Sequence, residues 1–431
     1  MNIGPVFREA GFWGLDRIRG SAIRHHLADI EVLSREPDRR QEALRVRQKA
    51  FLAHATATTG HYARFQGAQR LLDFPVLQKS EIREGYDGFR SAAFAPEELT
   101  SASTSGSYGT PLVFPLSRDK RARQLAELLY FTGWIGWKVG MRYLQVRARN
   151  PSRLQRFIHN EEVVDPTHMT PEWYRHGRAL LRDSGIQFLM GYPSAIHGLA
   201  EYCRDQGDGP DSFQLLGACL GGETLTPSAR RVMEDTFGCP VRSRYAANEL
   251  GVIGQEPLAE PGRHVLNACS LVPEVLCLDC DAPAPAGQVG RLVVTDLYSH
   301  ALPLIRYDTG DLGVLSERPD VGSRLPVLEC LEGRQTDVIL DAEGNPMSNL
   351  GLFDVFGGID KLIRFQLVQV GPARYLVRCV VFPGFDQEAR VAERVRAVLG
   401  PGAEIAVECV SDIPPLASGK RPAVLNRMSA R

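Results

Sequence analysis

The fold is decided by residues 171–246, which read PEWYRHGRALLRDSGIQFLMGYPSAIHGLAEYCRDQGDGPDSFQLLGACLGGETLTPSARRVMEDTFGCPVRSRYA. Pro171 opens a helical segment that Gly185 ends, and the short apolar run at 186–191 is typical of a strand. The same alternation continues along the stretch: a helix at 193–207, a strand at 213–222, a helix at 227–238 and a strand at 241–246. Such βαβαβ alternation predicts a parallel sheet with helices on its faces.

The flanking sequence extends this prediction to a large α/β domain. The first hundred residues favour helices, most clearly at 41–57, and residues 290–315 hold β-type runs separated by Pro and Gly. We therefore predict an N-terminal domain at 1–333 with parallel and mixed sheets and flanking helices.

The C-terminal stretch has a different pattern. It contains three strand-like runs and one helical run: LIRFQLVQVG (362–371), RYLVRCVVF (374–382), the helical FDQEARVAERVRAVLG (385–400) and EIAVECV (404–410). This pattern predicts a small, mobile α+β domain at 334–431, of about 95 residues, which is a typical size for an independent unit. We expect residues 333–346 to include the linker.

The composition argues against several classes of partner. The 431 residues carry 50 Lys plus Arg against 51 Asp plus Glu, a net charge of −1, so no basic surface for nucleic acid or anionic lipid is expected. We expect no signal peptide and no membrane span, and the odd number of nine cysteines favours the reducing cytoplasm. Only six of the 50 basic residues are lysines, which makes each lysine an unusual choice in this chain. The oligomeric state stays open, a homodimer included.

Polar residues follow three consecutive strands of the predicted parallel sheet. These loops read Gly191-Tyr192-Pro193, Gly221-Gly222-Glu223 and Tyr245-Ala246-Ala247-Asn248-Glu249. Any one of them is more simply read as a turn with a solvated acid. Ligands of open parallel sheets bind beyond the carboxyl ends of the strands, however, so the three together predict a site.

The segment SASTSGSYGT at 101–110 is a candidate phosphate loop. It carries six Ser or Thr hydroxyls, and Gly106 and Gly109 let the backbone approach a ligand closely. It lacks the Gly-Lys-Ser/Thr of a P-loop. As a bare pattern, such a segment is equally compatible with a flexible linker.

Six motifs occur together in one order, and they point to a family. They are TSGSYGTP (104–111), GGE (221–223), YAANE (245–249), RYDTGDL (306–312), GRQTD (333–337) and SGK (418–420). With this set the chain resembles the adenylate-forming superfamily of acyl-CoA synthetases. Within it, the chain is most similar to the phenylacetate-CoA ligase and capsular polysaccharide biosynthesis branch.

The resemblance implies a role for each motif residue in binding ATP and Mg²⁺. The implied roles are as follows: Thr104, Ser105, Gly106, Ser107 and Gly109 bind the phosphates; Tyr245, Gly222 and Glu223 surround the adenine; Asn248 is a further cofactor-binding residue; Glu249 binds Mg²⁺ and acts in catalysis with Lys420; and Asp311 and Arg334 contact the ribose. The implied reaction joins a small carboxylic acid to ATP, gives acyl-AMP and pyrophosphate, and then transfers the acyl group to CoA or another nucleophile.

Three departures from the family pattern keep other interpretations open. Asn248 replaces a usual Ser or Thr, Thr336 replaces the usual hinge acid, and VILDAEGNPMSNLG (338–351) differs from the Gly-rich loop of CoA ligases. An amine, an alcohol or a carrier protein therefore stands beside CoA as acceptor. From another class, a non-catalytic nucleotide-binding homologue also fits. A kinase or ATPase fits poorly because the P-loop lysine is missing.

The remaining candidates favour structural roles. Cys277 and Cys280 form a single CxxC in a run that we predict to be a strand, and a zinc site is the less favoured reading. His264 is also more simply structural. We expect the aromatic residues Tyr130, Trp134 and Trp137 to belong to the core, with an acyl-pocket wall as the alternative.

Overall fold

The computed structural model describes residues 4–103, 112–148, 151–334, 339–345, 347, 352, 355–357, 359–415 and 421–428. The chain divides into two compact units, each built from two separate stretches. Unit 1 combines Met1–Gly140 with Arg244–Leu331, and unit 2 combines Met141–Ser243 with Glu332–Arg431. The predicted domains, 1–333 and 334–431, describe a different division and stay a prediction.

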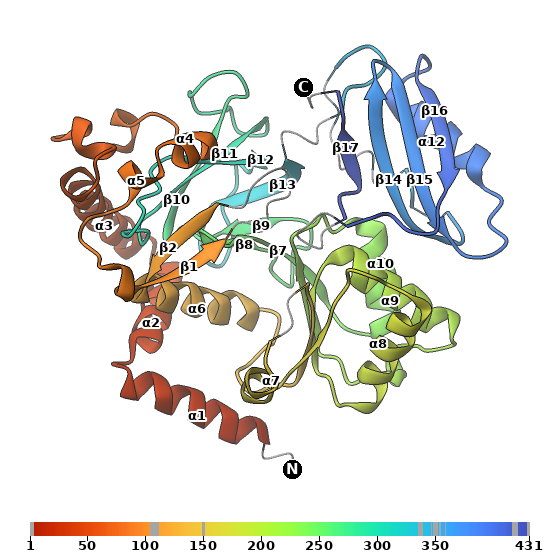
Figure 1. The fold of residues 1–431 in the computed structure, drawn as a ribbon, viewed down its shortest axis with the longest axis horizontal. Coiled ribbons are helices and arrows are strands. Elements are labelled where there is room, and N and C mark those ends of the chain that lie inside the picture. The colour runs from red at the N-terminus through yellow and green to blue at the C-terminus, as the bar shows by residue number, and fades with distance from the viewer. Residues whose placement is uncertain are drawn as a thin grey trace. The chain divides into compact units, whose positions relative to one another are not determined.

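Unit 1 begins with helices, as the sequence predicts (Figure 1). Its α-helices are α1 (Gly4–Ile18), α2 (Ala22–Arg35), α3 (Pro37–Thr58), α4 (Lys79–Glu84), α5 (Tyr86–Phe89) and α6 (Arg118–Gly133). Short 3₁₀ turns lie at Tyr62–Phe65, Leu71–Asp73 and Pro96–Glu98. The predicted helix at 41–57 is confirmed as part of α3, in which Phe51, Leu52 and Ala55 are buried.

The strands of unit 1 form antiparallel pairs. The strands are β1 (Leu99–Ser103), β2 (Val113–Ser117), β8 (Gly251–Gln255), β9 (His264–Leu266), β10 (Leu271–Leu276), β11 (Val289–Asp296), β12 (Tyr307–Leu315) and β13 (Val327–Arg334), with the second half of β7 (Val241–Ala247). β1 pairs with β2, and the others follow the order β10-β11-β12-β13-β9-β8-β7. β7 and β12 carry two of the sequence motifs, YAANE and RYDTGDL.

Unit 2 contains β5 and β6, two of the strands predicted at 171–246, together with β3 and β4, which precede that stretch. The strands β4 (Glu161–Val164), β3 (Tyr143–Val146), β5 (Phe188–Gly191) and β6 (Gly217–Gly221) lie in this order and are all parallel. The helices are α7 (Arg153–His159), α8 (Pro171–Asp183), α9 (Pro193–Asp205) and α10 (Pro227–Phe237), with a 3₁₀ turn at Pro210–Ser212. The predicted alternation of helix and strand is confirmed.

The C-terminal part of unit 2 contains a small sheet and helix α12 (Figure 1). It contains β14 (Leu362–Gly371), β15 (Arg374–Val381), α12 (Glu388–Leu399), β16 (Glu404–Cys409) and β17 (Val424–Asn426), with the strand order β16-β15-β14-β17. Three buried residues of α12, Val391, Val395 and Leu399, pack into the core of this sheet. The predicted α/β fold class with a smaller α+β part is therefore confirmed.

Two predicted strands are shorter than expected. β6 begins only at Gly217. The apolar residues Phe213 and Leu215, which we predicted to lie in this strand, are buried in the core but belong to an irregular segment before it. β10 ends at Leu276, so Cys277 and Cys280 lie in the turn that follows it, and their predicted strand is wrong.

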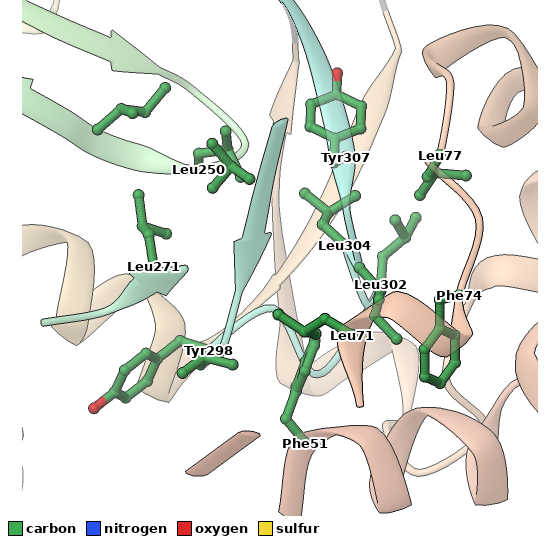
Figure 2. Close-up of a cluster of buried hydrophobic side chains, with 14 of the residues drawn as sticks. Phe51, Leu71, Phe74, Leu77, Leu250, Leu271, Tyr298, Leu302, Leu304 and Tyr307 are labelled. Atoms are coloured by element: carbon green, nitrogen blue, oxygen red, sulfur yellow. The ribbon is translucent and has the colours of Figure 1, made fainter. Parts of the chain in front are cut away.

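A large hydrophobic cluster forms the core of unit 1 (Figure 2). It joins residues of α3 and of the 3₁₀ turns to Leu250, Leu304 and Tyr307. The turn after β7 is therefore anchored by an apolar side chain next to polar motif residues. No helix in the described part of the chain is both long and apolar enough to cross a membrane.

Candidate active site

The structure brings together Tyr245 of β7 and Asp311 of β12. The Tyr245 hydroxyl donates a hydrogen bond to Asp311 Oδ2 at 2.7 Å and also lies 3.2 Å from Thr309 Oγ1. The backbone N–H of Asp311 also donates to Thr309 Oγ1, at 3.1 Å. Because Tyr245 is 7% exposed, its phenol is held in one orientation and in turn orients the Asp311 carboxylate. The pair offers an aromatic ring and a carboxylate that can accept hydroxyl donors.

Glu249 lies in the tight turn between β7 and β8. Its side chain is largely buried, with 8% exposed, and its Oε1 accepts a hydrogen bond from the Tyr307 hydroxyl at 3.1 Å. Among the described residues no lysine, arginine or histidine forms an ion pair with Glu249. A buried carboxylate that meets only a neutral donor is poorly compensated. Hard oxygen donors of this kind suit Mg²⁺, so the residues present fit the ion that the sequence analysis implies.

Asn248 connects this turn to the candidate phosphate loop. Its Nδ2 donates to the carbonyl of Ser103, at 2.8 Å, and Ser103 lies in the first part of this segment, directly before Thr104. Asn248 therefore holds one flank of the loop. The loop residues Thr104, Ser105, Gly106, Ser107 and Gly109 lie outside the described residues.

The aspartate of the Tyr-Asp-Thr-Gly sequence in β12 is a residue that the sequence analysis missed. Asp308 is buried, and its Oδ2 accepts from Arg291 Nη1 at 2.9 Å and from Gln78 Nε2 at 3.2 Å. Its Oδ1 accepts from the N–H of Gly310 at 2.9 Å, and Gly310 has a φ of +76°. Asp308 therefore shapes the turn that presents Asp311. Asp308 lies in the same RYDTGDL motif as Asp311, so the motif itself could have identified it.

In unit 2, Glu223 binds two backbone N–H groups. Its Oε2 accepts from Ser194 in the first turn of α9 at 3.0 Å, and its Oε1 accepts from Arg421 at 2.7 Å. A carboxylate at a helix N-terminus is favoured by the helix dipole. The preceding Gly222 has a φ of +84°, which suits glycine. The adenine-lining role of Gly222 and Glu223 stays a prediction.

Arg421, the neighbour of Lys420, is a second residue that the sequence analysis missed. Only 3% of it is exposed, and its guanidinium donates to the carbonyls of Ile413 at 2.8 Å, Pro166 at 2.8 Å and Thr167 at 3.0 Å. Burial and the nearby Arg364 guanidinium lower the pKa of Arg421. Nothing in its sequence context distinguished it from the other arginines.

Three further predicted or flagged groups fall outside the described residues. These are Lys420, Thr336 and the side chain of Arg334, which ends β13. Their roles stay predictions.

The cysteine pair does not form a metal centre in the described structure. The carbonyls of Cys277 and Cys280 accept hydrogen bonds from Arg291, at 3.0 and 2.9 Å. Within the described ranges, no group of three or more His, Cys, Asp or Glu side chains could hold a metal ion.

The aromatic residues after the candidate phosphate loop lie in or against the core. Tyr130 and Trp134 pack on the cluster that includes Ile30 and Leu33. The Tyr130 hydroxyl donates to Ser34 Oγ at 2.6 Å. A packing role is therefore confirmed for these two residues.

Comparisons with known proteins find similar sequences and similar folds. The family model of the CapK C-terminal domain matches residues 339–427. The chain is 24% identical to Protein CapK of Staphylococcus aureus, over 82% of this chain and 80% of that protein. It is 27% identical to the phenylacetate-coenzyme A ligase of Thermus thermophilus, over 64% of this chain and 63% of the ligase.

Solved structures show the same fold. The crystal structure of 2-hydroxyisobutyryl-CoA ligase in the postadenylation state, in complex with R3-HIB-AMP, matches with a TM-score of 0.73 at 18% identity, over 88% of each chain. ATP-bound MatB from Rhodopseudomonas palustris matches with a TM-score of 0.55 at 15% identity, over 77% of this chain and 68% of MatB. The chain is therefore similar in sequence to Protein CapK and to phenylacetate-coenzyme A ligase, carries a CapK C-terminal domain at residues 339–427, and shares its fold with CoA ligases.

Proposed function

We propose that this protein activates a small carboxylic acid with ATP. The carboxylate attacks the α-phosphorus, which gives acyl-AMP and releases pyrophosphate, and the acyl group then passes to an acceptor. The observation that carries the proposal is the cluster of Tyr245, Asp311 and Glu249 in unit 1, where β12 supplies a hydrogen-bond partner to Tyr245 and another to Glu249. These residues provide an aromatic ring, a ribose acceptor and a cation ligand.

Each of these residues has one task in nucleotide binding. Asp311 accepts hydrogen bonds from the ribose hydroxyls, and the Tyr245 hydroxyl keeps its carboxylate oriented. The Tyr245 ring offers a face for adenine. Glu249 would hold Mg²⁺, which supplies positive charge to the phosphates when it is bound. Asp308 acts on the site through the backbone, because it holds the turn before Asp311.

The chemistry needs positioning and charge stabilisation but no covalent enzyme intermediate. Hydroxyl and amide groups of Thr104, Ser105, Gly106, Ser107 and Gly109 bind the phosphates in this proposal. Lys420 places its ammonium near the attacking carboxylate and the α-phosphate. The anchoring of Arg421 supports this role, because a fixed neighbour limits the positions that Lys420 can reach.

CoA is the acceptor to test first. Two of the similar proteins, phenylacetate-coenzyme A ligase and 2-hydroxyisobutyryl-CoA ligase, are named for CoA transfer. The departures at residues 338–351 keep an amine or a carrier protein as the alternatives.

The experiment is ATP–pyrophosphate exchange with Mg²⁺ and a panel of small aliphatic and aromatic carboxylic acids. We expect exchange with at least one acid, and AMP with pyrophosphate as products. Addition of CoA should then convert the adenylate to a thioester. ADP and orthophosphate as the only products would refute the proposal.

Two variants with the same charge change sharpen the test. Asp311→Ala removes the ribose acceptor, whereas Asp279→Ala removes an exposed aspartate from the turn after β10. We expect the first variant to lose exchange activity and the second to retain it. Tight ATP binding without exchange on any acid would favour the non-catalytic homologue.

A further inference from the structure

One face of α6 carries three polar side chains that all meet the turn holding Glu249. They are Lys120, Gln124 and Glu127, at positions i, i+4 and i+7, which lie on the same side of a helix. The turn runs from Asn248 to Gly251, between β7 and β8. Helix α6 follows directly on β2, which is the described segment after the candidate phosphate loop.

Lys120 makes the most specific of these contacts. Its side chain is 1% exposed, and its Nζ donates to the carbonyl of Leu250 at 2.8 Å. The same ammonium lies 2.5 Å from Oδ2 of Asp296, whose side chain is fully buried. A buried lysine is costly unless it is paired and hydrogen-bonded, so both contacts are needed to keep it there. It is also one of only six lysines in a chain with 50 basic residues.

Gln124 bonds to the turn, and Glu127 lies beside it. Gln124 Nε2 donates to the carbonyl of Asn248 at 3.2 Å. The fully buried Glu127 lies against Gly251, where an added Cβ would be only 2.7 Å from its Oε2 and where φ is +92°. The turn is therefore held by backbone contacts on both sides of Glu249.

Two residues of the turn itself, Leu250 and Asn248, also hold it in place. The Leu250 side chain is fully buried in the cluster drawn in Figure 2, while its carbonyl points to Lys120. Asn248 donates to Ser103 in the first part of the candidate phosphate loop, directly before Thr104. A shift of this turn would therefore move Glu249 relative to the start of that loop.

We propose that Lys120, supported by Gln124 and Glu127, is a positioning residue that sets the Glu249 carboxylate for the Mg²⁺–nucleotide complex. The inference rests on the proposed function and deepens it. Lys120 itself touches no ligand, because it is buried under the turn. It acts through the Leu250 carbonyl, and Asp296 holds its ammonium in place.

The test measures ATP affinity by calorimetry, with Mg²⁺ and with EDTA, for the wild-type protein, Lys120→Met and Lys49→Met. Lys49 is exposed on α3 and gives the same charge change. We expect Mg²⁺ to strengthen ATP binding to the wild type and to Lys49→Met. In Lys120→Met, the gain in ATP affinity on adding Mg²⁺ should shrink by about tenfold or more, while the ATP affinity in EDTA stays within about twofold of the wild-type value.

In the exchange assay, kcat/KM of Lys120→Met for MgATP should fall about 100-fold, the order expected for a displacement near 1 Å. KM for the carboxylic acid should not change.

The double variant Lys120→Met/Asp296→Asn separates positioning from folding. It removes both charges of the buried pair, so it should regain thermal stability relative to Lys120→Met. If the Mg²⁺ response stays weak in the double variant, the positioning role is supported. If the Mg²⁺ response returns together with the stability, or if Lys120→Met binds MgATP as the wild type does, the inference is overturned. A wild-type protein that does not bind ATP would refute the proposed function itself, and the inference with it.

Discussion

Replacing Arg421 with methionine should slow adenylation while leaving ATP affinity nearly unchanged. Arg421 follows Lys420 directly, and its guanidinium donates to three carbonyls, those of Ile413, Pro166 and Thr167. Methionine fills much of the same volume but donates no hydrogen bond. The residue next to Lys420 would then lose its three hydrogen bonds to these carbonyls.

The size of the effect follows from these contacts. A hydrogen bond contributes about 1 kcal/mol net, so three of them contribute about 3 kcal/mol. Removing the guanidinium also relieves the cost of a buried charge, which is the reason that the pKa of Arg421 is lowered. We therefore expect a loss of about 1–3 kcal/mol in unfolding free energy. A displacement of Lys420 by about 1 Å should reduce the exchange rate about 100-fold.

The assay combines ATP–pyrophosphate exchange with urea unfolding. Arg427→Met is the matched control, because Arg427 lies six positions away and is exposed. We expect the control to unfold and to exchange as the wild type does. An Arg421→Met protein with the wild-type exchange rate and the wild-type urea midpoint would show that this anchor does not position Lys420.

Two further predictions concern catalysis and acid stability. Lys420→Ala should reduce adenylation by ~100- to 1000-fold with ATP binding nearly intact, because its charge is needed mainly in the transition state; Lys361→Ala should be near neutral, and equal exchange rates for both would contradict the role of Lys420. In Asp208, burial raises the pKa, but the ion pairs with Arg178 and Arg182 outweigh it and hold the pKa below its ordinary value. The stability from this lowered pKa is present above the unfolded pKa of about 3.9 and is lost as pH falls through the folded one. Asp208→Asn should therefore unfold at lower urea than the wild type at pH 7, and this difference should shrink from about pH 5 to pH 2; a constant difference in urea titrations across that range would be evidence against the ion pairs.

Much of the fold could be predicted because its signals are local. Proline at helix starts, glycine at helix ends and short apolar runs occur within a few residues of the elements that they define, so α8, α9, α10 and β5 were predicted within a few residues. The prediction of β6 was wrong at its start because an apolar residue can be buried without belonging to a strand. Phe213 is apolar because it packs into the core, although it lies before β6.

The sequence by itself determined the resemblance to the adenylate-forming enzymes and the identity of the candidate motif residues, because six short motifs occur in one order along the chain. It could not show which distant residues hold those motifs in place. The tertiary structure alone decided that Tyr307 donates to Glu249 and that Lys120 holds the Leu250 carbonyl. The partners in these two contacts are 58 and 130 positions apart. Such contacts depend on how strands and helices meet in space, and no local pattern of residues records that.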